Sequence, residues 1–218
     1  MRVGIITYDA NHLKTEQVFR RISGRHDYVF FLLPYTQRTQ RPVLFEHRPD
    51  QRGGIATRRL AEEYGVAWEL CAQDVDIEPG FDYYLVLGAG ILSAGCVSGK
   101  RILNCHPGVI PAVRGLDAFK WAVYDGQPLG VTLHFIDEAL DAGQIVSIVE
   151  TPVLPSDSLG DVAARHYETE LSLLSDFETH LANPRNPFVD IREGEPKRRM
   201  DARTESEMLK RFEVMKTP

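Results

Sequence analysis

The sequence predicts an α/β fold in which a mostly parallel central sheet is flanked by helices. In the first half of the chain, short apolar runs rich in β-branched residues alternate with segments of helical periodicity, and this alternation is typical of a parallel sheet. The 218 residues provide enough apolar surface for a core that needs no disulfide or metal to fold.

The elements of the first half are predicted from short apolar runs and from the residues that end them. We expect strands at residues 2–7, 27–33, 82–87 and 101–104, and helices at 14–22 and 55–64, the second ended by Gly65. Residues 34–54 lie between two of these elements and form a polar, arginine-containing stretch without clear periodicity. Because this stretch is long for a plain connection, we expect it to have a functional role.

The second half has a different pattern. Residues 130–137 and 144–149 read as two paired strands, and apolar residues at helical spacing predict a long helix over 158–181. Ser158 and Asp161 resemble a capping box at the start of that helix. We expect one domain over residues 1–181, followed by a surface tail with one short helix over 182–218.

Composition excludes several classes of protein. Lys plus Arg number 25 and Asp plus Glu number 31, so the net charge of −6 argues against a dedicated nucleic-acid binder. The apolar runs are far shorter than the roughly 20 residues of a membrane helix, and the start of the chain lacks a signal-peptide pattern. The 3 cysteines have no CxxC spacing, which indicates free thiols in a reducing, cytoplasmic compartment and no zinc ribbon.

Several known motifs are incomplete or missing. Gly88-Ala89-Gly90 follows a predicted strand, but Ser93 stands where a dinucleotide fingerprint needs glycine. The chain has no P-loop, no G-x-S-x-G elbow and no HExxH pair, so we expect neither a nucleophilic serine nor a metal site. Cys105 neighbours His106, but successive strand residues point to opposite faces, so Cys105 reads as a core residue.

Residues 104–115 carry the chemistry. Asn104 and His106 are two residues apart, so both side chains face one side at the carboxyl end of a predicted strand, where ligands bind in open α/β sheets. Asp141 lies on a separate predicted loop. An amide donor, an imidazole and a carboxylate suit acyl transfer to an amine: they stabilise an oxyanion, accept a proton and orient the base or a water.

The pattern N-x-H-P-x-x-[IL]-P-x-x-[RK]-G, followed by the D-x-G-x-I segment at Asp141, resembles the formyltransferases that use N10-formyltetrahydrofolate. The resemblance is strong over residues 82–152 and consistent in topology over 1–181. It implies the formyltransferase fold, a Rossmann-like sheet with helices on its faces and here a short C-terminal appendage. It also implies N10-formyltetrahydrofolate as the co-substrate and no metal.

The resemblance also implies roles for individual residues. Asn104, His106 and Asp141 fall on the family's catalytic residues, and His134 falls on a supporting histidine. The donor pocket falls on two loops, with Gly88, Ala89, Gly90, Ile91 and Leu92 on the first and Glu138, Ala139 and Leu140 on the second.

Departures from the family's branches indicate the acceptor. Glycinamide ribonucleotide transformylase binds phosphate with a Gly/Ser-rich loop after its first strand, whereas residues 8–15 here read YDANHLKT. Methionyl-tRNA formyltransferase has a further C-terminal domain, whereas only residues 182–218 follow the predicted core here. The run from Arg114 to Trp121 resembles the small sugar N-formyltransferases and also the formylation domains of peptide synthetases. We therefore expect the acceptor to be a nucleotide-linked amino-dideoxy sugar.

A diphosphate in such an acceptor would need arginine forks and lysine charges. The candidates are Asn11, His12, Lys14, Arg38, Arg41, Arg48 and Arg114. Three alternatives stay open: an enzyme like phosphoribosylglycinamide formyltransferase, a hydrolase that releases formate from the folate, and a formyltransferase acting on a carrier-bound amino acid. The partners expected are small molecules, without nucleic acid or membrane, and a homodimer stays open.

Overall fold

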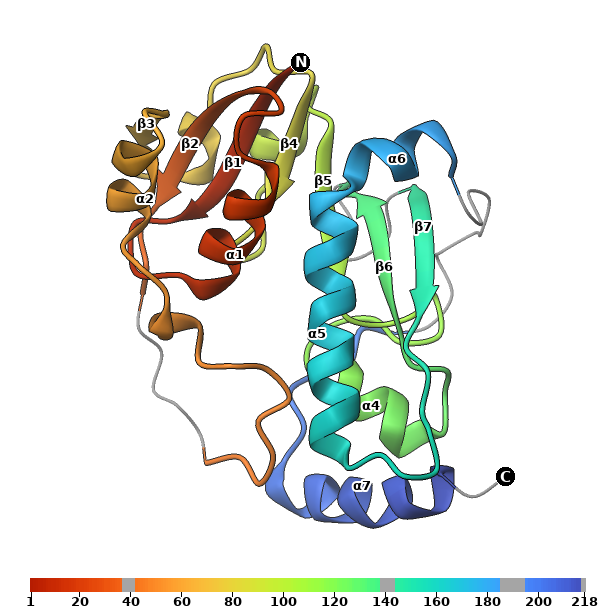
Figure 1. Cartoon of the computed structure of the whole chain (residues 1–218). Coiled ribbons are helices and arrows are strands. Elements are labelled where there is room, and N and C mark those ends of the chain that lie inside the picture. The colour runs from red at the N-terminus through yellow and green to blue at the C-terminus, as the bar shows by residue number, and fades with distance from the viewer. Residues whose placement is uncertain (37–41, 138–143, 185–194, 217–218) are drawn as a thin grey trace.

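One strand, β5, joins the parallel part of the sheet to its antiparallel part. The computed structural model describes residues 1–36, 42–137, 144–184 and 195–216, and within these residues a seven-stranded sheet runs in the order β3-β2-β1-β4-β5-β6-β7 (Figure 1). The strands are β1 (Arg2–Tyr8), β2 (Asp27–Leu33), β3 (Ala67–Leu70), β4 (Tyr83–Val86), β5 (Ile102–His106), β6 (Gly130–Phe135) and β7 (Ile145–Glu150). The helices are α1 (Leu13–Ile22), α2 (Thr57–Glu63), α3 (Ala94–Val97), α4 (Ala118–Asp125), α5 (Leu159–Ser175), α6 (Phe177–Ala182) and α7 (Ala202–Met215).

The sheet changes from parallel to antiparallel at β5. β1 pairs in parallel with β2 and β4, and β5 is parallel to β4 but antiparallel to β6. The register of the β5–β6 ladder places Asn104 opposite His134 and His106 opposite Thr132. The predicted α/β class is therefore confirmed, and the residues singled out on β5 lie where the two halves of the sheet meet.

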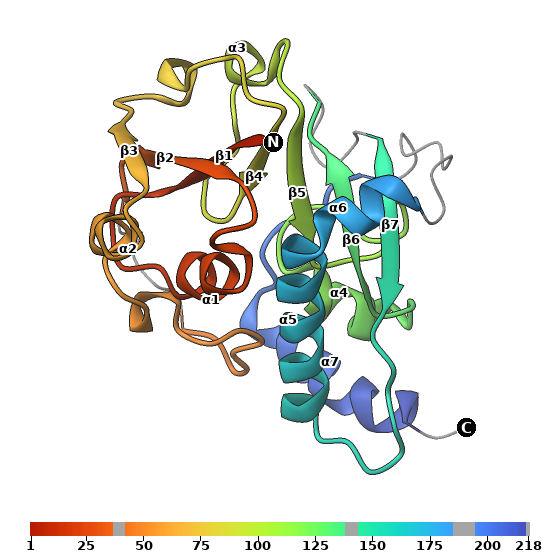
Figure 2. The same ribbon diagram turned by 45° about the horizontal axis from the view of Figure 1, so that its top comes forward.

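Each face of the sheet is covered by its own apolar cluster. On one face, α1 and α5 contact each other and bury Phe19, Leu171 and Leu174 against the strands (Figure 2). On the other face, Phe31 and Tyr84 pack with residues of α3. β5 is thus held from both sides by close-packed side chains.

Several elements differ from the sequence prediction. β3 was not anticipated, because its residues are half-buried or exposed at the edge of the sheet and carry no apolar alternation. The long helix predicted over 158–181 is divided at Asp176 into α5 and α6. Its start is as expected, because Ser158 and Asp161 form the capping box.

The C-terminal segment is longer in helix and more deeply packed than a surface tail. α7 has 14 residues and lies against α4, where Met208 and Phe212 are buried with Phe119. Ahead of α7, Lys197 is bridged in parallel to Gly115, and the Trp121 indole donates to the Arg198 carbonyl. The division of the chain after residue 181 stays a prediction, but this segment contributes to the core.

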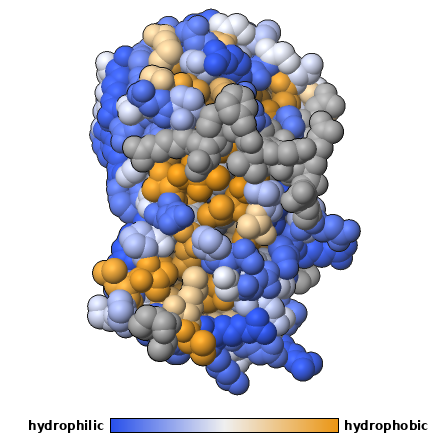
Figure 3. Space-filling model, turned by 90° about the vertical axis from the view of Figure 1, so that its right-hand side faces the viewer, coloured by the Kyte–Doolittle hydropathy of each residue, from blue (hydrophilic) through white to orange (hydrophobic). Residues whose placement is uncertain are grey.

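β7 is the strand at the end of the sheet. Figure 3 faces that side of the molecule, and apolar residues gather near the middle of it.

Across the described ranges, no helix is long and apolar enough to cross a membrane. Cys71, Cys96 and Cys105 are buried free thiols, and burial raises the pKa of the Cys105 thiol well above its usual value.

Phe212 tests whether α7 belongs to the core. Phe212→Ala should lower the free energy of unfolding by about 3 kcal/mol, because the ring is buried and its loss leaves a cavity. Chemical denaturation followed by circular dichroism measures this change. The control Val214→Ala, on the same helix but 74% exposed, should shift the midpoint little. Equal, small effects from both variants would show that α7 is not part of the cooperative unit.

Candidate active site

Asn104 and His134 form a polar pair across the β5–β6 ladder. The His134 Nδ1 atom lies 3.0 Å from the carbonyl oxygen of Phe135, and because a carbonyl only accepts, Nδ1 carries the proton. The Nε2 atom of the neutral ring is then an acceptor, and it receives a hydrogen bond from Asn104 Nδ2 at 3.3 Å. The pair fixes the amide of Asn104, and among the residues that the structure describes its second N–H has no partner, so it can donate to a ligand.

His106 has its tautomer fixed in the same way. Its Nε2 lies 2.9 Å from the carbonyl oxygen of Val113 and donates to it, so the lone pair of the neutral ring is on Nδ1. The ring is 3% exposed. A side chain at Gly108 would meet His106 Nε2 at 2.8 Å, so glycine is needed there for the ring to sit in place.

The loop after β5 is tied to β6 by one hydroxyl. Thr132 Oγ1 donates to the Gly108 carbonyl at 2.7 Å and accepts from the Ile110 amide at 3.2 Å. Thr132 is fully buried. The loop that carries Val113, and with it the partner of His106, therefore has a rigid attachment to the sheet.

The amino end of α1 is closed by side chains of the chain itself. His12 is the N-cap, and its Nδ1 accepts from the Thr15 amide at 3.3 Å. Gln51 Oε1 accepts from the Lys14 amide at 3.0 Å. Burial, followed by the charges of Lys14 and Arg48, lowers the pKa of His12 to about 4, so this ring is neutral near pH 7.

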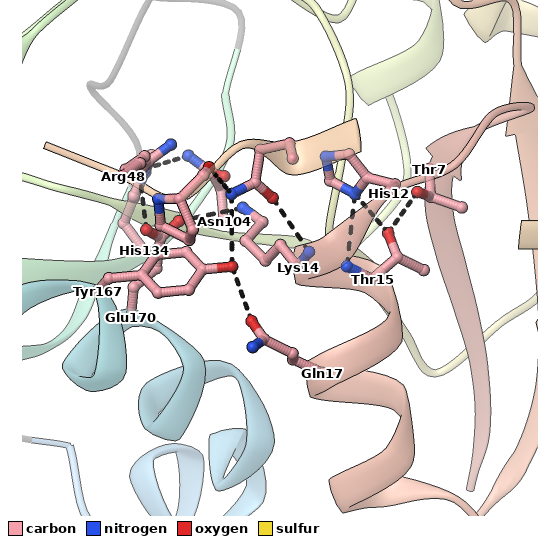
Figure 4. A network of polar contacts seen from close by, with 12 residues as sticks. Thr7, His12, Lys14, Thr15, Gln17, Arg48, Asn104, His134, Tyr167 and Glu170 are labelled. Atoms are coloured by element: carbon pink, nitrogen blue, oxygen red, sulfur yellow. Dashed lines mark hydrogen bonds and ion pairs between the residues drawn. The ribbon is translucent and has the colours of Figure 1, made fainter. Parts of the chain in front are cut away.

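A buried carboxylate joins two of the predicted substrate residues. Glu170 of α5 is fully buried and binds Lys14 Nζ at 3.0 Å and Arg48 Nη2 at 2.7 Å (Figure 4). Burial raises the pKa of Glu170, but the charges of Arg48 and Lys14 outweigh it and bring the pKa down to about 2. Tyr167, on the same helix as Glu170, donates to Gln17 Oε1 at 2.9 Å and extends this network toward α1.

Lys14 and Arg48, two of the candidates for substrate binding, are held together by Glu170, and both cations pair with that carboxylate. Asn11 is exposed and forms an isolated bridge with Ala56. Arg114 is 8% exposed, and its carbonyl accepts from the Lys197 amide. Arg38, Arg41, Glu138, Ala139, Leu140 and Asp141 lie outside the described residues.

The loop of residues 88–92, predicted to bind the donor, lies over the end of β1. A side chain at Gly88 would meet His12 at 2.8 Å and Tyr8 at 2.9 Å, so glycine allows the loop to approach these rings. Ile91 is 82% exposed, with the half-buried Ala89 and Leu92 near it in the chain. The loop therefore presents an uncharged, apolar edge.

Sequence reasoning missed Glu170, Gln51 and Thr132. Glu170 did carry a signal, since it is a charged residue between Tyr167 and Leu171 on the apolar side of a predicted helix. Gln51 and Thr132 act through contacts that no local pattern reveals. Within the described part of the chain, no three His, Cys, Asp or Glu side chains are grouped to hold a metal.

Comparisons with known proteins identify the family of this chain. A family model described as "Formyl transferase" matches residues 36–177. The chain is 40% identical over 81 residues to dTDP-4-amino-4,6-dideoxyglucose formyltransferase of Mycobacterium bovis, covering 37% of this chain and 35% of that protein. It is 38% identical over 74 residues to phosphoribosylglycinamide formyltransferase of Haemophilus influenzae, covering 34% of this chain and 35% of that protein.

The fold extends the similarity over nearly the whole chain. The structure of a 4-N formyltransferase from Francisella tularensis superposes with a TM-score of 0.64 at 18% identity, covering 97% of this chain and 87% of that one. The curated alignments, in contrast, span only 35% of the length of either relative.

The pKa of Glu170 predicts how acid affects stability. Its value falls from 4.5 to about 2 in the folded protein, so the contribution of the carboxylate is complete above the unfolded value and is lost as pH falls from about 4.5 toward 2. Glu170→Gln should lower the free energy of unfolding at pH 7 by about 3 kcal/mol, because Lys14 and Arg48 lose their shared anion.

Urea denaturation at several pH values between 7 and 2.5 measures both effects. The Glu170→Gln variant should show a shallower fall in stability over the acid range than the parent protein. The matched control is Glu168→Gln. Glu168 is on the same helix, but its side chain is 56% exposed and its partner is Arg21. Parallel acid profiles for the parent and the Glu170 variant would contradict the assigned pKa.

Proposed function

Because the chain belongs to the formyl transferase family, we propose that it moves the formyl group of N10-formyltetrahydrofolate to the amine of a nucleotide-linked amino-dideoxy sugar. The observation that carries the proposal is the polar pair of Asn104 and His134 beside His106 at the carboxyl end of β5. An amide N–H and a neutral imidazole with a fixed tautomer at this edge of the sheet suit acyl transfer.

The folate supplies a formyl carbon that is bonded to its N10 and open to attack by an amine. Asn104 directs its second Nδ2–H at the oxygen of that carbon and stabilises the negative charge that develops there. His106 accepts the proton of the attacking amine at Nδ1, the nitrogen that is not committed to Val113, and returns it to N10 as the old C–N bond breaks. We assign to Asp141 the orientation of this proton transfer.

The loop of residues 88–92 fits the donor. Its apolar edge at Ala89, Ile91 and Leu92 suits the flat face of a pteridine, and Gly88 and Gly90 leave the main chain accessible. Together with Glu138, Ala139 and Leu140, these residues are the proposed donor pocket.

The closed amino end of α1 supports a sugar nucleotide over a phosphoribosyl acceptor. A helix terminus binds phosphate through amides that lack other partners. Here Gln51 and His12 already accept from the Lys14 and Thr15 amides. Among the relatives, the M. bovis protein is named for dTDP-4-amino-4,6-dideoxyglucose. We propose an acceptor of that class, with Arg48 and Lys14 on its side of the site.

A transfer assay by mass spectrometry tests the function. The protein is mixed with N10-formyltetrahydrofolate and one of three acceptors: dTDP-4-amino-4,6-dideoxyglucose, a 3-amino sugar nucleotide or glycinamide ribonucleotide. Gain of one formyl group on a sugar nucleotide is the expected result. Transfer to glycinamide ribonucleotide alone would identify a phosphoribosylglycinamide formyltransferase, and formate released without any acceptor would identify a hydrolase.

The role of Asn104 is tested by Asn104→Asp, which keeps the size of the side chain and removes its N–H donors. We expect kcat to fall roughly 100-fold or more, as for the loss of an oxyanion donor, while the KM for the folate changes little. The matched control is Asn183→Asp at the exposed end of α6. A kcat within a few fold of the parent would remove Asn104 from the oxyanion role.

A further inference from the structure

α7 lies outside the part of the chain that the family model matches, yet it contacts a segment that leads to the site. The match covers residues 36–177, and α7 begins at Ala202. Figure 1 shows residues 42–50 passing beside α7 and then returning toward the sheet. Arg48 lies near the end of this segment, shortly before Gln51, whose side chain accepts from the Lys14 amide.

One carboxylate of α7 holds the start of that segment. Glu205 is 1% exposed, and it accepts from the Leu44 amide at 2.7 Å and from the Phe45 amide at 3.4 Å. Lys120 of α4 donates to the same carboxylate and neutralises it. Glu205 therefore joins α7, α4 and the 42–48 segment at a single buried point.

The segment has few other attachments. Over the described residues, the amides of 42–48 make hydrogen bonds only to Glu205, and this stretch belongs to no helix or strand. Besides the ion pair of Arg48 with Glu170, the segment has ring contacts: Phe45 and His47 stack on Phe119, with centroids 6.5 and 5.8 Å away. The path of the main chain through 42–48 thus depends on Glu205 and on Phe119, which α7 itself helps to bury.

The far end of the segment reaches the site. Arg48 binds Glu170 at 2.7 Å, and its side chain keeps 32% of its surface exposed. Glu170 is on α5, a helix that contacts β5, and Figure 4 shows Arg48 in the same network of polar side chains as Asn104 and His134. A shift of the main chain at Leu44 would therefore move a cation that belongs to the polar network around Asn104.

We propose that Glu205 is a positioning residue for the acceptor half of the site, which acts by fixing residues 42–48 and, through them, Arg48. The proposal rests on the proposed function. A buried ion pair alone is a poor source of stability, since apolar side chains of the same size often serve as well. A carboxylate that also receives two main-chain amides does what no apolar residue can do: it sets the path of a segment that lacks secondary structure.

Hydrogen exchange gives the first test, and it needs no acceptor. Exchange is followed by mass spectrometry on the peptide that covers 42–48 in the parent protein, in Glu205→Gln and in the control Glu207→Gln. Glu207 is on the same helix but 44% exposed, and it contacts Tyr124 and Arg203. We expect faster exchange in 42–48 for the Glu205 variant only. Equal protection in all three proteins would overturn the proposal.

Kinetics with the acceptor found in the transfer assay give the second test. Glu205→Gln should raise the acceptor KM about tenfold and leave the folate KM and kcat within about twofold. Arg48→Met should raise the acceptor KM by more, and the double variant should be no worse than Arg48→Met alone, because both changes remove the same contact. Additive losses, or equal rises in both KM values, would assign Glu205 a purely structural role.

Failure of the proposed function and failure of the role proposed for Glu205 give different results in these two tests. If the parent protein formylates no sugar nucleotide, the proposed function fails, and the exchange comparison still decides whether Glu205 fixes the segment. If Glu205→Gln gives little folded protein, both measurements are made on Glu205→Asp. That variant keeps the charge beside Lys120 and shortens the reach to Leu44, so the same loss of protection and the same rise in acceptor KM are expected.

Discussion

The buried carboxylate of Glu170 is the constraint on which the rest of the site depends. It lies on α5, inside the apolar layer that packs on the sheet, and it can be ionised there only because Lys14 and Arg48 meet it. Through Lys14 the carboxylate holds the start of α1, and through Arg48 it holds the end of the 42–48 segment. One ion cluster therefore sets the relative positions of three elements around the carboxyl end of β5.

The chemistry of the site follows from two imidazoles whose protons are placed by main-chain carbonyls. Phe135 and Val113 accept from His134 and His106, so each carbonyl fixes which ring nitrogen carries the proton. His134 accepts from Asn104 at its other nitrogen, and the role that we propose for His106 is that of the base. Because the partners are carbonyls of β6 and of a loop tied to β6, the tautomers are consequences of the fold rather than of pH.

The acceptor half of the proposed site is assembled from α1, the segment that ends at Gln51, and α7. Gln51 and His12 close the amino end of α1, and α7 lies beyond the family match. The proposed catalytic half uses β5 and the loop that follows it. Such a division lets one reaction be directed to different amines while the acyl-transfer geometry stays unchanged.

The sequence alone determined the α/β class, most strands and the shared face of Asn104 and His106, because these depend on periods of two and 3.6 residues within a local stretch. It did not place β3, whose edge position leaves no apolar pattern, and it took α7 for a surface tail. Only the tertiary structure decided how the charges pair. Glu170 lies 156 residues from Lys14 and 122 from Arg48, and Glu205 lies 161 from Leu44. Contacts at such separations depend on how the elements pack, and no local pattern encodes them.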